Sequence, residues 1–317
     1  MRIALLGATS QIARDLSLSF LTREEHELTL YARRPDVVEK WLDAVAVPRR
    51  PAVADLARFD VVTPFDAVIN FVGVANPAAA IAMGAQILEV TAKVDDMVMA
   101  YLERRPACRY VFLSSGAAYC SNFDAPADEH TRSTLTLNHL HPQDWYGLAK
   151  MYAECRHRAR PDLSIIDLRV FSYFSRTQDM SARFLLTDAM RSIRSATVLQ
   201  TSSAQNLRDY LHPSDFHSLI DCLLRHEPSN TALDCYTRAP IDKWTLLEAM
   251  RTRFSLQYEV AGADVAINAT GSKLHYYSLD RRAAAFGYAP SMSSIEGVLL
   301  EAQEYLDTDP GRERTTP

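Results

Sequence analysis

The sequence has little of several features that mark specialised classes of protein. Its five cysteines are widely spaced and include no Cys-x-x-Cys pair, so neither a disulfide framework nor a zinc site is indicated. A net charge of −5 gives no basic surface for nucleic acid or an anionic membrane. The first apolar run ends at Gly7 and is too short for a signal sequence or a membrane span. We therefore expect a cytoplasmic protein with no metal site and no nucleic-acid or membrane partner.

Short apolar runs alternate with helical stretches through residues 1–170. The expected strands are about Ile3 to Leu6, Leu28 to Tyr31, Ala52 to Leu56, Asp66 to Val74, Arg109 to Leu113 and Ser164 to Val170. The expected helices are about Gln11 to Leu21, Asp36 to Ala44, Pro77 to Arg104 and the stretch that contains Tyr146. This alternation predicts an α/β fold with a Rossmann-like, doubly wound parallel sheet, whose ligands lie beyond the carboxyl ends of the strands.

The alternation loosens beyond residue 170. Helices are expected at about Asp215 to Leu224, Lys243 to Phe254 and Ser294 to Tyr305, between shorter strands and without a Gly- or Ser-rich linker. With 317 residues the chain is long enough for a second, smaller unit. We predict a dinucleotide-binding domain over 1–170, a smaller α/β substrate lobe over 171–308 and a tail over 309–317.

The segment Trp145 to Lys150 holds a phenol and an ammonium four residues apart. On a helix this spacing places Tyr146 and Lys150 on one face. A lysine cation one turn away favours the phenolate, so we expect a lowered pKa for Tyr146 and a role in proton transfer. The alternative is a chance spacing, since the pair alone is a weak signal.

The turn after the first strand could hold a pyrophosphate. Gly7, Thr9, Ser10, Gln11 and Ile12 connect that strand to a helix, whose amino-terminal amides favour anions. Only the first glycine of a dinucleotide fingerprint is present, because Ser10 and Ala13 stand where closer approach favours glycine. The alternative is an ordinary glycine turn before a helix.

The second strand ends in Tyr31-Ala32-Arg33-Arg34, where an acid would bind the adenosine ribose of NAD. Two guanidiniums suit a 2′-phosphate instead, so NADP is expected in preference to NAD. A solvated basic turn is the alternative. After the third strand, Asp55, next to Leu56, could accept a hydrogen bond from the adenine amine or cap the following turn.

Together these motifs resemble the extended short-chain dehydrogenase/reductase family, which contains nucleotide-sugar epimerases, dehydratases and ketoreductases. The resemblance covers nearly the whole chain. It rests on the Gly7 to Ala13 turn, Phe71-Val72-Gly73, Ser115 to Tyr119, Tyr146 with Lys150, Leu168 to Phe171, Arg208 to Asp215 and Phe286 to Pro290. It implies that Ser115, Tyr146 and Lys150 are catalytic, that Phe71, Val72, Gly73 and Val170 contact the cofactor, and that Ala117, Ser172 and Arg208 contact substrate.

Some residues differ from the family pattern. Ser172 and Ser175 stand where Asn and Gly are frequent, Thr91 stands where Asn is common, and Cys120 follows Tyr119 where Gly is usual. Gly116 and Ala117 replace the acidic pair of dehydratases, which argues against dehydration.

We therefore expect NADP-dependent reduction of a keto group on a nucleotide-linked 4-keto-6-deoxy sugar. A nucleotide-sugar 4-epimerase with tightly bound cofactor is the alternative within the family. A non-catalytic dinucleotide-binding sensor or assembly protein is the alternative of another class. The resemblance also implies a homodimer through the long helix about Pro77 to Arg104 and the helix of Tyr146. The apolar residues of the long helix exceed what one buried face needs: Ile81, Ile87, Val94, Met97, Val98 and Tyr101.

Overall fold

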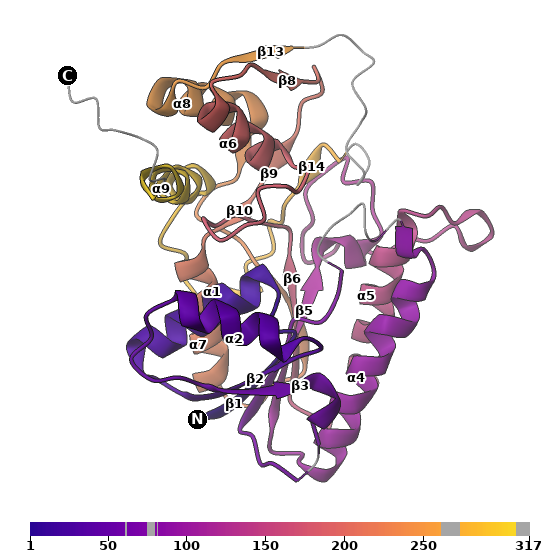
Figure 1. The fold of residues 1–317 in the computed structure, drawn as a ribbon. Coiled ribbons are helices and arrows are strands. Elements are labelled where there is room, and N and C mark those ends of the chain that lie inside the picture. The colour runs from indigo at the N-terminus through magenta and orange to yellow at the C-terminus, as the bar shows by residue number, and fades with distance from the viewer. Residues whose placement is uncertain (61, 75–79, 81, 261–272, 309–317) are drawn as a thin grey trace.

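The computed structural model describes residues 1–60, 62–74, 80, 82–260 and 273–308 (Figure 1). Its centre is a seven-stranded sheet in the order β11-β6-β5-β4-β1-β2-β3, and every neighbouring pair is parallel. The strands are β1 (Arg2–Leu6), β2 (Glu27–Ala32), β3 (Ala52–Asp55), β4 (Ala67–Asn70), β5 (Arg109–Ser115), β6 (Ile165–Val170) and β11 (Thr231–Asp234). The predicted Rossmann-like fold is confirmed.

The sheet is covered on both faces because its strands are apolar on both sides. Ile3 and Leu5 of β1 belong to one core with Phe20, whereas Leu6 belongs to the other with Val98. Alternate residues of a strand point to opposite faces, so an unbroken apolar run needs two covering layers.

Helices form both layers. Helices α1 (Gln11–Arg23), α2 (Pro35–Ala44) and α7 (Pro213–Arg225) lie on one face, and α4 (Gln86–Arg104) and α5 (Asp144–Arg158) lie on the other (Figure 1). Within the described ranges, no helix has both the length and the apolar character needed to cross a bilayer.

The remaining elements form a lobe beyond the carboxyl ends of the strands (Figure 1). It contains α6 (Leu185–Ser195), α8 (Lys243–Phe254) and α9 (Ser294–Asp307), with small sheets that pair β8 (Leu199–Thr201) with β13 (Tyr258–Val260), β7 (Ser172–Tyr173) with β10 (Tyr210–Leu211), and β9 (Leu207–Arg208) with β12 (Ile241–Asp242) and β14 (His275–Tyr276). Its core includes Phe174, Met190, Leu247 and Ala302.

The chain beyond Val170 is not confined to this lobe. Strand β11 pairs with β6 in the central sheet, and α7 packs against α1. A division at residue 170 therefore separates β11 and α7 from the sheet layer to which they belong. Pairing of β11 with β6 is favourable because β6 would otherwise be an open edge of the sheet, with unpaired backbone groups.

The apolar residues of the long helix are already buried within the chain. Ile87, Val94, Val98 and Tyr101 are all less than a tenth exposed, and they pack against the sheet and its neighbouring elements. Ile81 lies outside the described residues. These four side chains therefore do not supply the second apolar face that was expected to contact a partner, and that part of the prediction is wrong.

Candidate functional site

The expected catalytic residues meet at the carboxyl edge of the sheet. Ser115 ends β5 and caps the short helix η2 (Gly116–Tyr119), while Tyr146 and Lys150 lie on α5. The first turns of α5 can approach η2 because Gly147 has no side chain: a Cβ there would lie 2.6 Å from the Ala117 carbonyl oxygen. The structure therefore brings together all three residues, and Ala117 beside them.

Tyr146 keeps its proton in this environment. Burial raises the pKa of Tyr146, and a hydrogen bond from Ser115 acts in the opposite direction. The expectation that Lys150 lowers the pKa of Tyr146 is wrong in this structure. The reason is geometric, since the Lys150 ammonium donates to the Leu113 carbonyl at 2.7 Å and lies 6.0 Å from the Tyr146 ring centroid.

Lys150 is buried between the strand ends and α5. Its Nζ lies 4.5 Å from the centroid of the Phe112 ring, and a Cβ on Gly73 would lie 3.3 Å from it. Burial lowers the pKa of Lys150 to about 8, while the carboxylates of Glu154 and more distant acids oppose that shift. Lys150 thus lies between Tyr146 and Gly73, the residue that follows the end of β4.

The turn after β1 has the shape of an anion cradle. Gly7 has φ of +82°, and a Cβ there would lie 3.0 Å from the backbone of Phe71 and Val72. The amides of Gly7 and Ala8 donate to the Tyr31 carbonyl, so the turn is held against β2. Ser10 caps α1, and Thr9, Gln11 and Ile12 are partly buried around its first turn. This amino-terminal turn fits the diphosphate of a dinucleotide.

The residues expected near the adenosine fall into two groups. Arg33 and Arg34 are exposed after β2 and, among the described residues, have no carboxylate partner. The Tyr31 ring, however, is buried against Phe59 and Phe65. This residue can therefore contact a ligand at the site only through its backbone atoms.

Beside that region, Asp55 caps the turn that begins at Leu56. Its carboxylate accepts from the Ala57 amide at 2.8 Å, which is the capping role weighed against an adenine contact. Leu56 is buried in the core below the same strand ends.

Comparison with known proteins agrees with this arrangement. The sequence profile of the NAD dependent epimerase/dehydratase family matches residues 3–235. The chain belongs to that family. It is therefore an enzyme of the extended short-chain dehydrogenase/reductase type. No curated protein matches its sequence.

Several solved structures of this fold are similar over nearly their whole length. UDP-glucose 4-epimerase from Bifidobacterium longum, in complex with NAD+ and UDP, has a TM-score of 0.77 and 14% identity, covering 98% of this chain and 99% of that one. The Thermotoga maritima UDP-glucose 4-epimerase has a TM-score of 0.78 and 15% identity, with 97% and 99% covered. The dTDP-glucose 4,6-dehydratase of Bacillus anthracis, in complex with NAD, has a TM-score of 0.74 and 14% identity, with 98% and 97% covered.

In this epimerase/dehydratase-family chain the lobe adds a residue that the motifs did not reveal. The Tyr276 hydroxyl lies 3.2 Å from Ser115 Oγ. The Arg208 guanidinium and the Lys273 ammonium lie 5.5 and 4.6 Å from the centroid of the Tyr276 ring. Arg208 donates to the Lys273 carbonyl and is largely buried, which lowers its pKa. No short motif marks Tyr276, because it lies 161 residues from Ser115.

The serines that replace the family's Asn and Gly have different surroundings. Ser175 is buried and donates to Asp15 of α1 at 2.7 Å, and the Gln11 amide donates to Ser175 at 2.8 Å. Tyr173 and Thr177 also donate to the Asp15 carboxylate. Ser172 is partly buried in β7, and no comparable hydrogen bond of its side chain is seen among the described residues. Ser175 therefore joins the nucleotide turn to the lobe.

Cys120, which also differs from the family pattern, and the end of β6 lie close to the same site. Cys120 has φ of +48°, in the left-handed region that favours the usual glycine. Val170 is buried at the end of β6, and Phe171 beyond it packs its ring against Gly116, where a Cβ would lie 2.5 Å from ring carbons.

The helix that carries Tyr146 and Lys150 is also tied to β5 and β6. Glu154, one turn beyond Lys150, accepts from Ser114 Oγ at 2.5 Å and forms a bidentate ion pair with Arg169. Charge-assisted pairs of this geometry fix orientation. Glu154 thereby sets the rotation of α5 that aims Lys150 at the strand ends.

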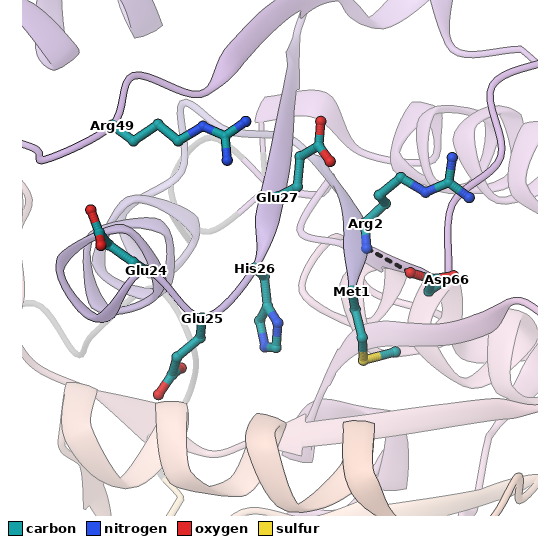
Figure 2. Close-up of a pocket in the computed structure, with 8 residues that line it drawn as sticks. All are labelled: Met1, Arg2, Glu24, Glu25, His26, Glu27, Arg49 and Asp66. Carbon is teal, nitrogen blue, oxygen red and sulfur yellow. Dashed lines mark hydrogen bonds between the residues drawn. The ribbon is translucent and has the colours of Figure 1, made fainter.

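A pocket of about 330 Å³ lies at the opposite edge of the sheet (Figure 2). It is lined by Met1, Arg2, Glu24, Glu25, His26, Glu27, Arg49 and Asp66, and the Arg2 amide donates to Asp66 at 2.6 Å. These residues surround the amino-terminal ends of β1 and β2, far along the strands from Tyr146. The pocket is therefore separate from the candidate site.

Proposed function

We propose that this enzyme uses NADPH to reduce the keto group of a nucleotide-linked 4-keto-6-deoxy sugar. The observation that carries the proposal is the Ser115–Tyr146 pair, in which a phenol that keeps its proton lies beside a second hydroxyl. A group that must give a proton to a developing alkoxide has to be protonated at the working pH. The raised pKa of Tyr146 meets that requirement.

The residues present fit a dinucleotide at this edge. The Gly7 turn and the first amides of α1 would hold its diphosphate, Phe71, Val72 and Gly73 would border the adenosine side, and Val170 would lie toward the nicotinamide. When bound, the nicotinamide supplies a hydride to the carbonyl carbon. Lys150 would hold the ribose hydroxyls next to it, because its ammonium lies beside Gly73.

Side chains of the protein would then form hydrogen bonds to the carbonyl oxygen and protonate it. Ser115 donates a hydrogen bond to it, which stabilises the negative charge that develops as the hydride arrives. Tyr146 donates a hydrogen bond and then its proton, leaving the alcohol. Lys150 donates to the Leu113 carbonyl rather than to the phenol, so its part in the reaction would be to hold the ribose in place.

The preference for NADPH is supported by Arg33 and Arg34. Both guanidiniums are exposed at the end of β2 without a carboxylate partner among the described residues. A 2′-phosphate would give each a charge-assisted partner. The substrate class is supported by Arg208, whose guanidinium faces Tyr276 and which would contact an anionic part of a nucleotide sugar.

The alternative is a nucleotide-sugar 4-epimerase that retains its cofactor. It is supported by the solved structures of the same fold that are 4-epimerases, one in complex with NAD+ and UDP and one with UDP-glucose. An epimerase begins by taking a proton from a hydroxyl, so it would need Tyr146 as phenolate once the cofactor is bound.

One experiment separates the two reactions. The purified enzyme is mixed with NADPH and nucleotide-linked 4-keto-6-deoxyhexoses, and in parallel with UDP-glucose and UDP-galactose. We expect reduced nicotinamide to disappear in equal amount to the ketosugar. Interconversion of the UDP-hexoses without net loss of reduced cofactor would identify an epimerase instead.

We also propose that the enzyme works as a homodimer in a reducing cytoplasm. The five cysteines are all free, which suits that compartment. Dimerisation through α4 and α5 now rests on the family resemblance, since the inner apolar residues of α4 are buried within the chain.

A further inference from the structure

Ser115 lies between two phenols that come from distant parts of the chain. Tyr146 on α5 shares a hydrogen bond with it, and the Tyr276 hydroxyl on β14 lies 3.2 Å from its Oγ. A serine hydroxyl has one proton to donate and lone pairs that accept. Ser115 can therefore donate to only one of these neighbours or to a substrate at a time, and its lone pairs can accept from the others.

The surroundings of Tyr276 hold its ring in place. The ring packs edge-on against Phe123 at 4.9 Å and against Phe171 at 5.3 Å between centroids. Phe171 in turn packs against Gly116, the residue after Ser115. The direction of the phenol is thus fixed by rings on both sides rather than by the hydrogen bond alone.

The same surroundings favour Tyr276 as the donor. Burial raises the pKa of Tyr276 to about 12, so the phenol keeps its proton throughout the neutral range. The Lys273 ammonium lies 4.6 Å from the ring centroid, and the Arg208 guanidinium lies 5.5 Å from it. Nearby positive charge strengthens an O–H donor because it stabilises negative charge on the oxygen.

We propose that Tyr276 is a positioning residue, whose phenol donates to Ser115 Oγ and turns the serine proton toward Tyr146 in the free enzyme and toward the carbonyl once substrate is bound. Chains of hydrogen bonds polarise their members, so a serine that accepts from Tyr276 is a stronger donor itself. Because β14 belongs to the lobe, the lobe completes the reacting centre. The carbonyl contact rests on the proposed reduction, whereas the direction of the Tyr276–Ser115 hydrogen bond does not.

The first test needs no substrate. Tyr146 is replaced by 3,5-difluorotyrosine, whose phenol titrates well below that of tyrosine, and its ionisation is followed by fluorine NMR. In the Tyr276→Phe background we expect the pKa of residue 146 to rise, because Ser115 has lost the donor that strengthened its own hydrogen bond. An unchanged or lowered pKa would mean that Ser115 donates to Tyr276, and it would overturn the proposal.

The second test is kinetic and uses a ketosugar that the wild type reduces. For Tyr276→Phe we expect kcat to fall roughly tenfold with KM within about twofold, because the lost interaction acts on the serine in the transition state. Wild-type kcat would also overturn the proposal. Tyr277→Phe is the matched control, since this neighbouring phenol has its ring 6.2 Å from that of His275, and circular dichroism verifies that both variants are folded.

The two proposals fail differently. If the wild type reduces no ketosugar, the proposed function fails, while the fluorine titration still decides the role of Tyr276. If the ketosugar is reduced but neither the pKa of residue 146 nor kcat responds to Tyr276→Phe, only the inference on Tyr276 fails.

Discussion

Lys150 Nζ lies 6.0 Å from the centroid of the Tyr146 ring, one helical turn away on α5. Its hydrogen bond goes to the Leu113 carbonyl and not to the phenol. The two side chains therefore share a site without forming a pair in this structure. Their separate roles lead to different expectations for their variants.

Loss of the Tyr146 hydroxyl should stop the reaction and leave cofactor binding intact. In Tyr146→Phe the ring still fills its place, but no group remains to give the proton. We expect turnover to fall by at least about a hundredfold and the Kd for NADPH to change little, measured by cofactor absorbance and fluorescence titration. Tyr152→Phe, at an exposed position of the same helix, is the control. Near-normal turnover of Tyr146→Phe would remove this residue from the mechanism.

Lys150→Ala should impair both rate and cofactor affinity, because the ammonium is expected to hold the ribose and, with it, the position of the nicotinamide. The pKa of Lys150, lowered by burial to about 8, adds a pH dependence. The ammonium is present below that value, so the activity of the wild type should decline as the pH rises through about 8. In Lys150→Arg the cation persists and this decline should be absent. A variant with reduced rate and unchanged affinity would show that Lys150 does not contact the ribose.

The choice of cofactor should depend on Arg33. If its guanidinium binds the 2′-phosphate, NADPH should bind more tightly than NADH by roughly 1.5 to 3 kcal/mol per charge-assisted hydrogen bond. Arg33→Asp should shrink or reverse that preference, because a carboxylate repels the phosphate and can accept from a ribose hydroxyl. The Kd values of both cofactors are measured at fixed ionic strength, with exposed Arg253→Asp as the control. Equal affinities in the wild type would contradict the preference for NADPH.

The stability of the sheet layer should depend on the protonation of His157. Its ring nitrogens lie 2.6 Å from Asp167 and 2.8 Å from Asp95, and all three side chains are fully buried. Burial alone would lower the pKa of His157, but the two carboxylates outweigh it and raise the pKa to about 9. A group whose pKa is raised on folding stabilises the protein fully below its unfolded pKa of about 6.5, and this contribution is lost as the pH rises through about 9.

His157→Gln measures that contribution. We expect its free energy of unfolding to be lower than that of the wild type by roughly 3 kcal/mol at pH 6, with the gap narrowing above pH 9. Denaturant unfolding at both pH values gives the difference, and exposed His139→Gln is the control. A gap that does not vary with pH would mean that His157 is neutral in the folded protein.

The oligomeric state is tested directly. We expect light scattering at micromolar concentration to give twice the mass of 35.6 kDa. A charge reversal on the exposed side of α4, such as Asp96→Lys, should reduce the dimer fraction more than a reversal at Glu248 of α8. A monomeric mass in the wild type would contradict the homodimer.

The sequence by itself determined the layers of the fold and most of the site. Unbroken apolar runs such as Ile3 to Leu6 require a sheet covered on both faces, and parallel strands bring their carboxyl ends to one edge. Gly7, Ser115, Tyr146 and Lys150 could therefore be placed together, because each follows a strand or lies within one turn of its partner. Local spacing was sufficient for these predictions.

The tertiary structure decided what distant segments do to one another. The pKa of Tyr146 depends on burial and on Ser115 rather than on the lysine four residues away, because electrostatics follow the direction of the ammonium and not the spacing along the helix. The contacts of Tyr276 with Ser115 and of Ser175 with Asp15 span 161 and 160 residues. Such contacts form only when the lobe packs on the sheet, so no local pattern of residues could have revealed them.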